Sequence, residues 1–309
     1  MLYHIEPVLE SFIWGGDQIV KAYHLDTTLK NVGMIYHVIA LEGAQDCIVR
    51  ETGEHLSAFY RTHPEVFGSS APVFPLRLAT SCSEKKMSYH LHPDNAYAWA
   101  HEGTMGKVSG SIAIHPNGAS HTILFGNKAA SLEEFKQLVA QHDWDGLFHT
   151  MEVRSEDFLH TPAGVIHGGG GSGELHMVFA TNSDISYRFY DYDRNDPSRK
   201  LHLQQVYDCV NIPEIPLAPV KPAVTEQDGV KRTFYYAKPG EYVAERLDVD
   251  GPGTYEREQF YCLTCAEGSG SINGVPIGPA ETVLVPAHSG PVTLAGKLLL
   301  YMISYLDEL

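Results

Sequence analysis

The chain alternates short apolar runs with glycine, proline and asparagine, and this pattern continues through most of its length. Examples are VGMIYHVIAL, GSIAIHP and ETVLVPA, which are rich in β-branched and aromatic residues. Such residues fit the pleated surface of a sheet, and the glycines and prolines between the runs mark turns. The pattern predicts a mainly β protein, built as a sandwich or barrel, with helices as small insertions.

Two segments depart from this pattern and predict helices. After Ser131, the segment LEEFKQLVAQHDWDGLF carries apolar residues at helical spacing, and Ser131 and Glu134 form a capping-box pattern. A shorter helix is expected from Glu54 to Thr62, where apolar side chains fall on one side and the pair His63-Pro64 ends the helix.

A proline-rich stretch divides the predicted elements into two groups. NIPEIPLAPVKPAV, residues 211–224, separates a longer first part from a tail that consists almost entirely of strand patterns and turns. With 309 residues, the chain is long enough for two cores. We therefore expect two jelly-roll β-barrel domains, residues 1–215 with the helical insertion and residues 216–309 without a metal site.

The tail offers little chemistry of its own. Cys262 and Cys265 form a single C-x-x-C without a second pair, so two cysteines on a strand are the favoured interpretation over a metal site. His288 is expected in a loop.

Charge limits the partners of this chain. The formal net charge is −16, with 22 Lys and Arg residues and no basic block. Such a chain repels polyanions, which argues against nucleic acid as a partner. A phosphorylated small molecule stays possible, because one phosphate needs only two or three local cations or backbone amides.

Hydropathy and cysteine usage indicate a compartment. Apolar residues make up 43% of the chain without any run of about 18 of them, and the segment MLYHIEPVLE lacks the features of a signal peptide. The five cysteines form an odd set without the spacing of a disulfide framework. We expect a cytoplasmic protein with reduced thiols and no membrane partner.

Three histidines stand out as candidate metal ligands. His90 and His92 are separated by one residue in SYHLHP, and alternate residues on a strand face the same side. A pair of exposed histidines explains such a motif about as well as a metal does. The segment TPAGVIH then brings His167 on a strand after a Pro-Gly turn, where a third imidazole could reach the same point.

Several motifs, in order, resemble the type I phosphomannose isomerase (mannose-6-phosphate isomerase) family of the cupin superfamily. They are Trp14-Gly-Gly, FPL from Phe74, HPDNAYA from His92, HEGTMGK from His101, PAGVIH and NSDISYRFYDYDR from Asn182, and they span roughly residues 3 to 210. The last is the most specific of them. The resemblance implies two cupin-like domains and interconversion of mannose 6-phosphate and fructose 6-phosphate through a cis-enediol.

The same resemblance implies roles for particular residues. The family's metal ligands fall at His90, His92, Ser109 and His167 in this chain, and its active-site cations fall at Arg188 and Lys107. Since Ser109 replaces the family's glutamate, the implied metal set is the three histidines. The implied metal is one Zn²⁺ ion, with another divalent metal as an alternative.

Other family positions are also changed, which leaves the substrate open. The family's Lys and Asp before the metal motif are Ala79 and Cys82, which we expect to remove polar groups from the sugar pocket. His37, Glu174 and His176 are candidate bases, each more readily explained as a structural or exposed residue.

Three functions remain at this point: a mannose-6-phosphate isomerase, a divergent paralogue acting on another sugar or sugar phosphate, and a non-catalytic sugar-binding cupin. In each, the partner is a small-molecule sugar or sugar phosphate. The sequence does not indicate an oligomeric state.

Overall fold

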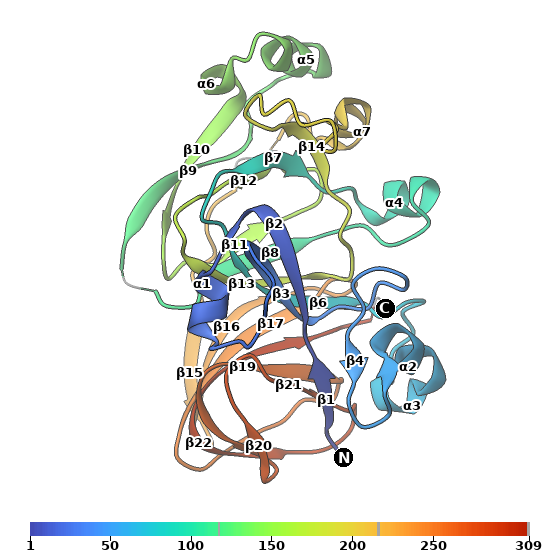
Figure 1. Cartoon of the computed structure of the whole chain (residues 1–309), viewed down its shortest axis with the longest axis vertical. Helices are drawn as coiled ribbons and strands as arrows, with labels where there is room; N and C mark the ends of the chain where they lie inside the picture. Colours follow the sequence, from blue (N-terminus) through green and yellow to red (C-terminus); the bar gives the residue numbers. More distant parts are fainter. Residues whose placement is uncertain (117, 215–216, 308–309) are drawn as a thin grey trace.

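Strands dominate the structure, a computed structural model that describes residues 1–116, 118–214 and 217–307 (Figure 1). They form one large sheet in the lower half of the view, a second sheet above it, and two small sheets at the top. The predicted mainly β class is therefore confirmed.

The large sheet collects the C-terminal strands. Its order is β15 (Ala223–Gln227), β16 (Val230–Ala237), β17 (Val243–Asp250), β22 (Val292–Ser304), β19 (Tyr261–Ile272), β21 (Thr282–Val285), β1 (Tyr3–Glu6), β4 (Ile48–Val49) and β5 (Glu54–His55). Two short strands pair at its margins, β18 (Gly253–Tyr255) with β22 and β20 (Val275–Ile277) with β19.

The N-terminal strand lies inside this C-terminal sheet. Strand β1 pairs with β21 on one side, with Tyr3 opposite Leu284, and with β4 on the other, with Ile5 opposite Val49. The two parts of the chain thus share a sheet. The division into residues 1–215 and 216–309 stays a prediction; residues 215 and 216 lie outside the described residues.

The second sheet forms one wall of a cavity. Its order is β11 (Leu159–Thr161), β8 (Ser109–Ala113), β13 (Leu175–Thr181), β6 (Leu76–Cys82), β3 (Val32–Val38) and β2 (Val8–Gly16). Along β13 the two faces separate by alternation: Met177 and Phe179 enter a buried apolar cluster, whereas His176 and Val178 line the cavity.

That apolar cluster joins the two sheets. It includes Phe179 of the second sheet together with Tyr242 and Tyr301 of the C-terminal part, all fully buried. The two parts therefore pack through a shared core. A separate buried apolar cluster consists of residues from the C-terminal part of the chain, among them Leu263 and Leu300.

Two small sheets complete the upper half. One runs β12 (His167–Gly169), β7 (Met87–Leu91) and β14 (Tyr187–Tyr190), and the other pairs β10 (Phe148–Arg154) with β9 (Ser120–Asn127). The first of these carries the candidate metal ligands.

Both predicted helical segments form helices, with different bounds. Helix α5 (Leu132–Ala140) begins after Ser131, whose side chain accepts the Glu134 N–H at 3.1 Å, as the capping box predicts. The segment does not continue as one helix, because α6 (Trp144–Leu147) follows as a separate turn.

The shorter predicted helix begins two residues later than expected. Helix α2 spans Leu56–Thr62, because Glu54 and His55 pair with β4 as a strand. The remaining helices are α1 (Gln18–Ala22), α3 (Pro64–Phe67), α4 (Asn95–His101) and α7 (Leu203–Cys209). None of the helices in the described part of the chain is long and apolar enough to cross a membrane.

Candidate metal centre

Strand pairing brings two of the three predicted histidines together. His167 of β12 lies directly opposite His90 of β7, and on the other side of β7 the same His90 lies opposite Arg188 of β14. Directly opposite residues in antiparallel strands point their side chains to the same face. His92 lies two residues after His90 and therefore faces the same side.

The three imidazoles converge on one point. One nitrogen from each ring lies within 4.8 Å of one from each of the others, and the ring centroids of His90 and His167 are 4.4 Å apart. In the described residues, this is the only group of His, Cys, Asp or Glu side chains found with such convergence. The predicted grouping of these three residues is thus present in the structure.

Hydrogen bonds orient all three rings in the same way. The Nδ1 atoms of His90, His92 and His167 lie 2.9, 2.7 and 3.0 Å from the backbone oxygens of Ser88, Ile185 and Val165. A carbonyl only accepts, so each Nδ1–H donates and each Nε2 keeps its lone pair. Ligand histidines of metal sites are held by this kind of bond.

Burial keeps these histidines neutral. It lowers the pKa of His167 to about 4, and together with the neighbouring histidines and Lys107 it lowers the pKa of His90 and His92 well below the usual value. Only the neutral imidazole binds a metal ion. Three neutral, preoriented nitrogens fit a catalytic metal site, in which a fourth position stays open for water or substrate.

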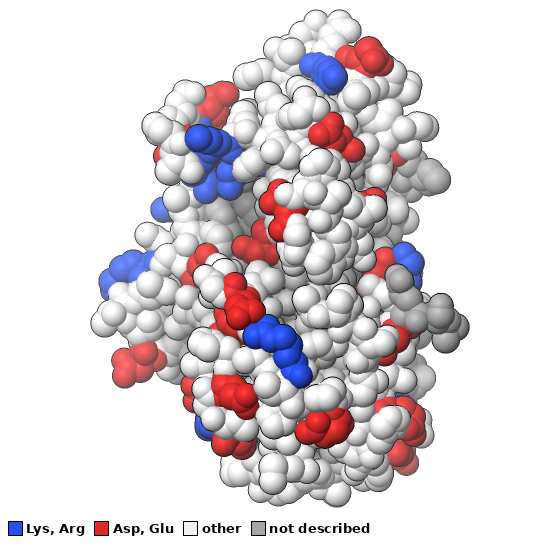
Figure 2. Space-filling view, turned by 90° about the vertical axis from the view of Figure 1, so that its right-hand side faces the viewer, with Lys and Arg blue, Asp and Glu red and all other residues white. Residues whose placement is uncertain are grey.

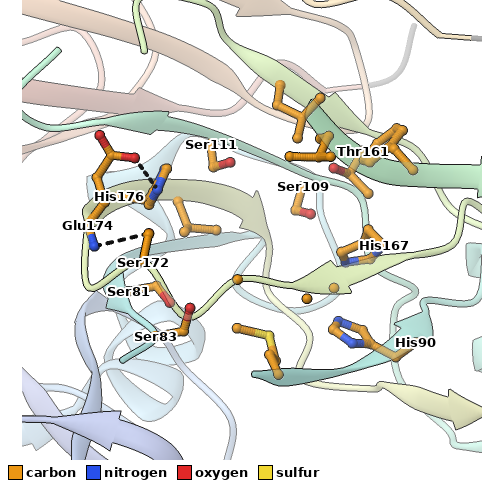
Figure 3. Close-up of a pocket in the computed structure, with 18 of the residues that line it drawn as sticks. Ser81, Ser83, His90, Ser109, Ser111, Thr161, His167, Ser172, Glu174 and His176 are labelled. Atoms are coloured by element: carbon orange, nitrogen blue, oxygen red, sulfur yellow. Dashed lines mark hydrogen bonds and ion pairs between the residues drawn. The ribbon is translucent and has the colours of Figure 1, made fainter. Parts of the chain in front are cut away.

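The histidines lie at one end of a large cavity. Its volume is about 1100 Å³, and it is bounded by the second sheet, by the small histidine-bearing sheet, and by the turn after β12. Both predicted cations, Lys107 and Arg188, line it, as does Ser109. Figure 3 shows Ser109 and His167 close together and His90 across from them.

Arg188 is free of the ion pairs that a structural role would require. Its Nη1 donates to the backbone oxygen of Lys200 at 3.0 Å, and no carboxylate in the described residues pairs with it. Asp191 instead pairs with Arg194 at 2.5 Å and with Arg199 at 2.9 Å. The guanidinium of Arg188 therefore has donors left for a ligand.

Lys107 is a buried amine at the same cavity. Its side chain makes no hydrogen bond or ion pair within the described residues, and burial, followed by repulsion from Arg77, lowers its pKa to about 7. An amine with this pKa exists in both forms near neutral pH, which suits a group that holds or moves a proton.

Sequence reasoning missed Arg77. This residue of β6 is 2% exposed and lines the cavity, where its Nη1 lies 3.1 Å from Asp184 and 3.0 Å from the Ser183 oxygen. Its Nε is buried and has no hydrogen-bond partner among the described residues. The available signal was a single charge within a strand, LRLATSC, that otherwise has small or apolar residues.

The expected pocket loss at Cys82 is wrong, whereas the one at Ala79 stays a prediction. Neither residue lines the cavity: Ala79 packs in the shared apolar core, and Cys82 packs against Ile35 on the opposite face of the sheet. Alternation turns Cys82 to the face away from Arg77 and Ser81, whereas Ala79 shares their face and lies opposite Val178, which lines the cavity. The cavity side of β6 therefore carries the polar residues Arg77 and Ser81, with the small Ala79 between them.

The three candidate bases separate in the structure. His37 is fully buried, with Nε2 2.9 Å from the Thr80 hydroxyl, and does not line the cavity, so its structural interpretation holds. Glu174 and His176 do line the cavity and pair at 3.3 Å. Figure 3 shows this pair at the end away from His90 and His167.

The cysteines and the histidine considered in the C-terminal part are placed as the sequence predicts. Cys262 and Cys265 are buried on β19, and His288 is exposed in a loop with its Nδ1 3.1 Å from Glu258. All five cysteines are free thiols.

Charges on the outer surface are mixed. Figure 2 shows Lys and Arg side chains in small groups, separated by Asp and Glu, over one face of the molecule. The cations that line the cavity are thus a local feature of the site.

Two curated proteins show similarity over most of this chain. It is 30% identical over 304 residues to the probable mannose-6-phosphate isomerase GmuF of Bacillus subtilis, covering 94% of this chain and 95% of that protein. It is 32% identical over 241 residues to the mannose-6-phosphate isomerase of Streptococcus mutans, covering 76% and 75%. No protein-family model matches the chain.

Solved structures share the fold. The mannose 6-phosphate isomerase of Bacillus subtilis superposes with a TM-score of 0.89 over 98% of this chain and 99% of that chain, at 24% identity. A zinc-bound mannose 6-phosphate isomerase superposes with a TM-score of 0.76 at 11% identity, covering 99% of each chain.

Proposed function

Since this chain belongs to the mannose-6-phosphate isomerase family, we propose that it is a zinc-dependent isomerase that interconverts mannose 6-phosphate and fructose 6-phosphate through a cis-enediol. The main support for this proposal is that His167, His90 and Arg188 are direct neighbours on three adjacent strands. Lys107 lines the same cavity.

His90, His92 and His167 would hold the ion through their Nε2 atoms. When bound, zinc supplies a positive charge that stabilises negative charge developing on substrate oxygens. The backbone carbonyls that accept from the three Nδ1 atoms fix the rings for this task.

Three cationic side chains would assist the reaction in different ways. Arg188 presents several donors in one plane and is suited to hold two oxygens of the enediolate or of the phosphate. Lys107, with a pKa of about 7, is suited to take or return a proton at the carbon or hydroxyl that reacts. Arg77 adds a fixed positive charge within the same wall.

A divergent activity on another sugar phosphate is the second candidate. One observation favours it: Ser109 lies on the cavity wall where the family has a glutamate ligand, so the proposed metal shell carries no negative charge. A metal held by three neutral imidazoles is a stronger acid toward substrate oxygen, and its ligand preference differs accordingly.

Metal content and turnover, measured on one preparation, test the proposal. We expect about one zinc per chain and formation of fructose 6-phosphate from mannose 6-phosphate, lost on chelation and restored by zinc. Zinc-loaded protein that isomerises another hexose phosphate in its place would favour the second candidate. A metal-loaded protein that binds sugar phosphates without converting any would identify a non-catalytic cupin.

A further inference from the structure

The cavity is larger than a hexose phosphate requires. Its volume of about 1100 Å³ exceeds the range of about 300–1,000 Å³ typical of pockets for drug-sized ligands. A hexose phosphate is smaller than such ligands. Most of the cavity is therefore left over when one sugar phosphate lies at the histidines.

The register of the second sheet gives the distance from the histidines to the opposite end of the cavity. Ser109 of β8 lies opposite Ala180, near the histidines, whereas Ala113 of the same strand lies opposite His176. Ser109 and Ala113 are four residues apart, which corresponds to about 13 Å along the strand. Figure 3 likewise places Glu174 and His176 at one end of the cavity and His90 and His167 at the other.

The far end has hydrogen-bonding groups suited to hydroxyls. The Glu174 carboxylate pairs with His176 at 3.3 Å, and the side chains of Ser81, Ser83 and Ser172 line the cavity beside them. The hydrogen bond from His176 lowers the pKa of Glu174, so this end keeps a carboxylate acceptor at neutral pH.

An aromatic pair also lines the cavity. The rings of Phe12 and Trp14 stack with centroids 4.5 Å apart and planes 15° from parallel. A side chain at Gly33 would lie 2.6 Å from Trp14, so this glycine makes room for the pair beside Met34, which lies opposite Ser81. Aromatic faces carry partial negative charge and attract the C–H groups of a sugar ring.

Charge divides the cavity into two ends. Arg77 lies directly opposite Ala180 and, with Lys107, near the histidines. A phosphate is favoured at this end. At the other end, the Glu174 carboxylate disfavours a second anion, while Arg154 and Asp157, which also line the cavity, carry opposite charges. Hydroxyl-binding groups, an aromatic pair and a negative charge together suit an uncharged sugar.

We propose that the Glu174 end of the cavity is a second subsite, which takes an uncharged sugar ring attached to the reacting hexose phosphate. This inference rests on the proposed function and names its substrate class, a reducing disaccharide phosphate. The reducing residue lies at the histidines in its open-chain form, with its first two carbons free to react, and the attached ring reaches Glu174, His176 and the aromatic pair.

Calorimetric titration with two alditols tests the subsite without turnover. The probes are mannitol 6-phosphate and the same compound with a mannosyl group on O4; neither has a carbonyl to isomerise. The zinc-loaded protein should bind the glycosylated probe at least about tenfold more tightly, as expected for added hydrogen bonds to charged groups. The double variant Glu174→Ala, His176→Ala should lose this preference and keep its affinity for mannitol 6-phosphate.

A matched control uses an exposed histidine–glutamate pair outside the cavity lining, His115 and Glu267, whose side chains lie 2.9 Å apart. His115→Ala, Glu267→Ala should keep the full preference. Glu174→Gln retains the shape of the side chain and should lose part of it, so a folding defect in the double variant would not hide the effect.

The outcomes separate the subsite from the proposed function. Equal affinity of the wild type for both probes would overturn the subsite, even if mannose 6-phosphate is converted. A preference that survives in both Glu174 variants would overturn it too. A preference that Glu174 controls, in a protein that converts neither mannose 6-phosphate nor its glycosylated form, would uphold the subsite and refute the proposed isomerase.

Discussion

The cavity and the C-terminal sheet both bury charge, but they treat it differently. In the C-terminal sheet, Glu245 is 2% exposed and accepts from Arg232 at 2.9 Å, Arg257 at 3.0 Å and Tyr255 at 3.2 Å. At the cavity, Lys107 has no side-chain partner in the described residues, and Arg188 reaches only a backbone oxygen.

This difference distinguishes charged groups that stabilise the fold from charged groups that are available to bind a ligand. A buried ion that lacks partners costs free energy, which a protein recovers only when something binds beside it. A carboxylate with three partners leaves nothing for a ligand. We therefore expect changes at the two places to affect different properties.

The largest effect on activity is expected at the histidines. The double variant His92→Ala, His167→Ala should lose its bound zinc and essentially all turnover, because a single imidazole does not retain the ion. Elemental analysis and turnover would be compared with His288→Ala, an exposed histidine outside the cavity. Unchanged metal content in the double variant would refute the site.

The largest effect on stability is expected at Glu245. Replacing it by alanine leaves two arginines without their acceptor, and should lower the free energy of unfolding by about 3 kcal/mol or more. Turnover per folded molecule should stay the same. Urea unfolding and activity would be measured on the same sample; a stable variant with reduced turnover would remove the contrast between the two regions.

Arg188 should show the opposite behaviour. Arg188→Ala is expected to reduce turnover roughly a hundredfold or more, because one contact in the transition state is lost, while bound metal and stability change little. Arg188→Lys should restore little of it, since an ammonium lacks the planar pair of donors. A variant that unfolds at lower urea but keeps its turnover would assign Arg188 a structural role.

The smallest change from one measurement to the next concerns Lys107 and pH. Its pKa is about 7 in the folded protein and near 10.5 in the unfolded chain, so between these values the unfolded chain binds one more proton. Stability therefore rises with pH across this window, by at most about 1.4 kcal/mol per unit. Lys107→Met should be more stable than the wild type at pH 7 and should lack this rise.

Urea midpoints of metal-free protein at pH 7, 8 and 9 would measure the difference between the two slopes. Parallel slopes for wild type and Lys107→Met would show that the amine titrates normally.

Local patterns were sufficient for the histidine group. The spacing of His90 and His92 follows from strand geometry, and the turn before His167 was visible in the sequence. The capping box at Ser131 likewise located the start of a helix. Each of these depends on residues close together in the chain.

Long-range pairing explains what was missed. Arg77 reaches the cavity because β6 pairs with β13 in a register that no local signal specifies, and the same register turns Cys82 away from it. The late start of the helix expected from Glu54 has a local cause, because Glu54 and His55 pair with Val49 and Ile48 in a short hairpin. The roles of Arg188 and Lys107 stay predictions, drawn from position and surroundings.

The place of β1 in the C-terminal sheet has a consequence for biosynthesis. Tyr3–Glu6 is translated long before its partner β21, Thr282–Val285. Its other edge can pair with β4 early, but the edge that faces β21 stays open until that late strand is translated. During that interval its open edge is exposed to other nascent chains, and a truncation that removes it would leave β21 with the same exposed edge permanently.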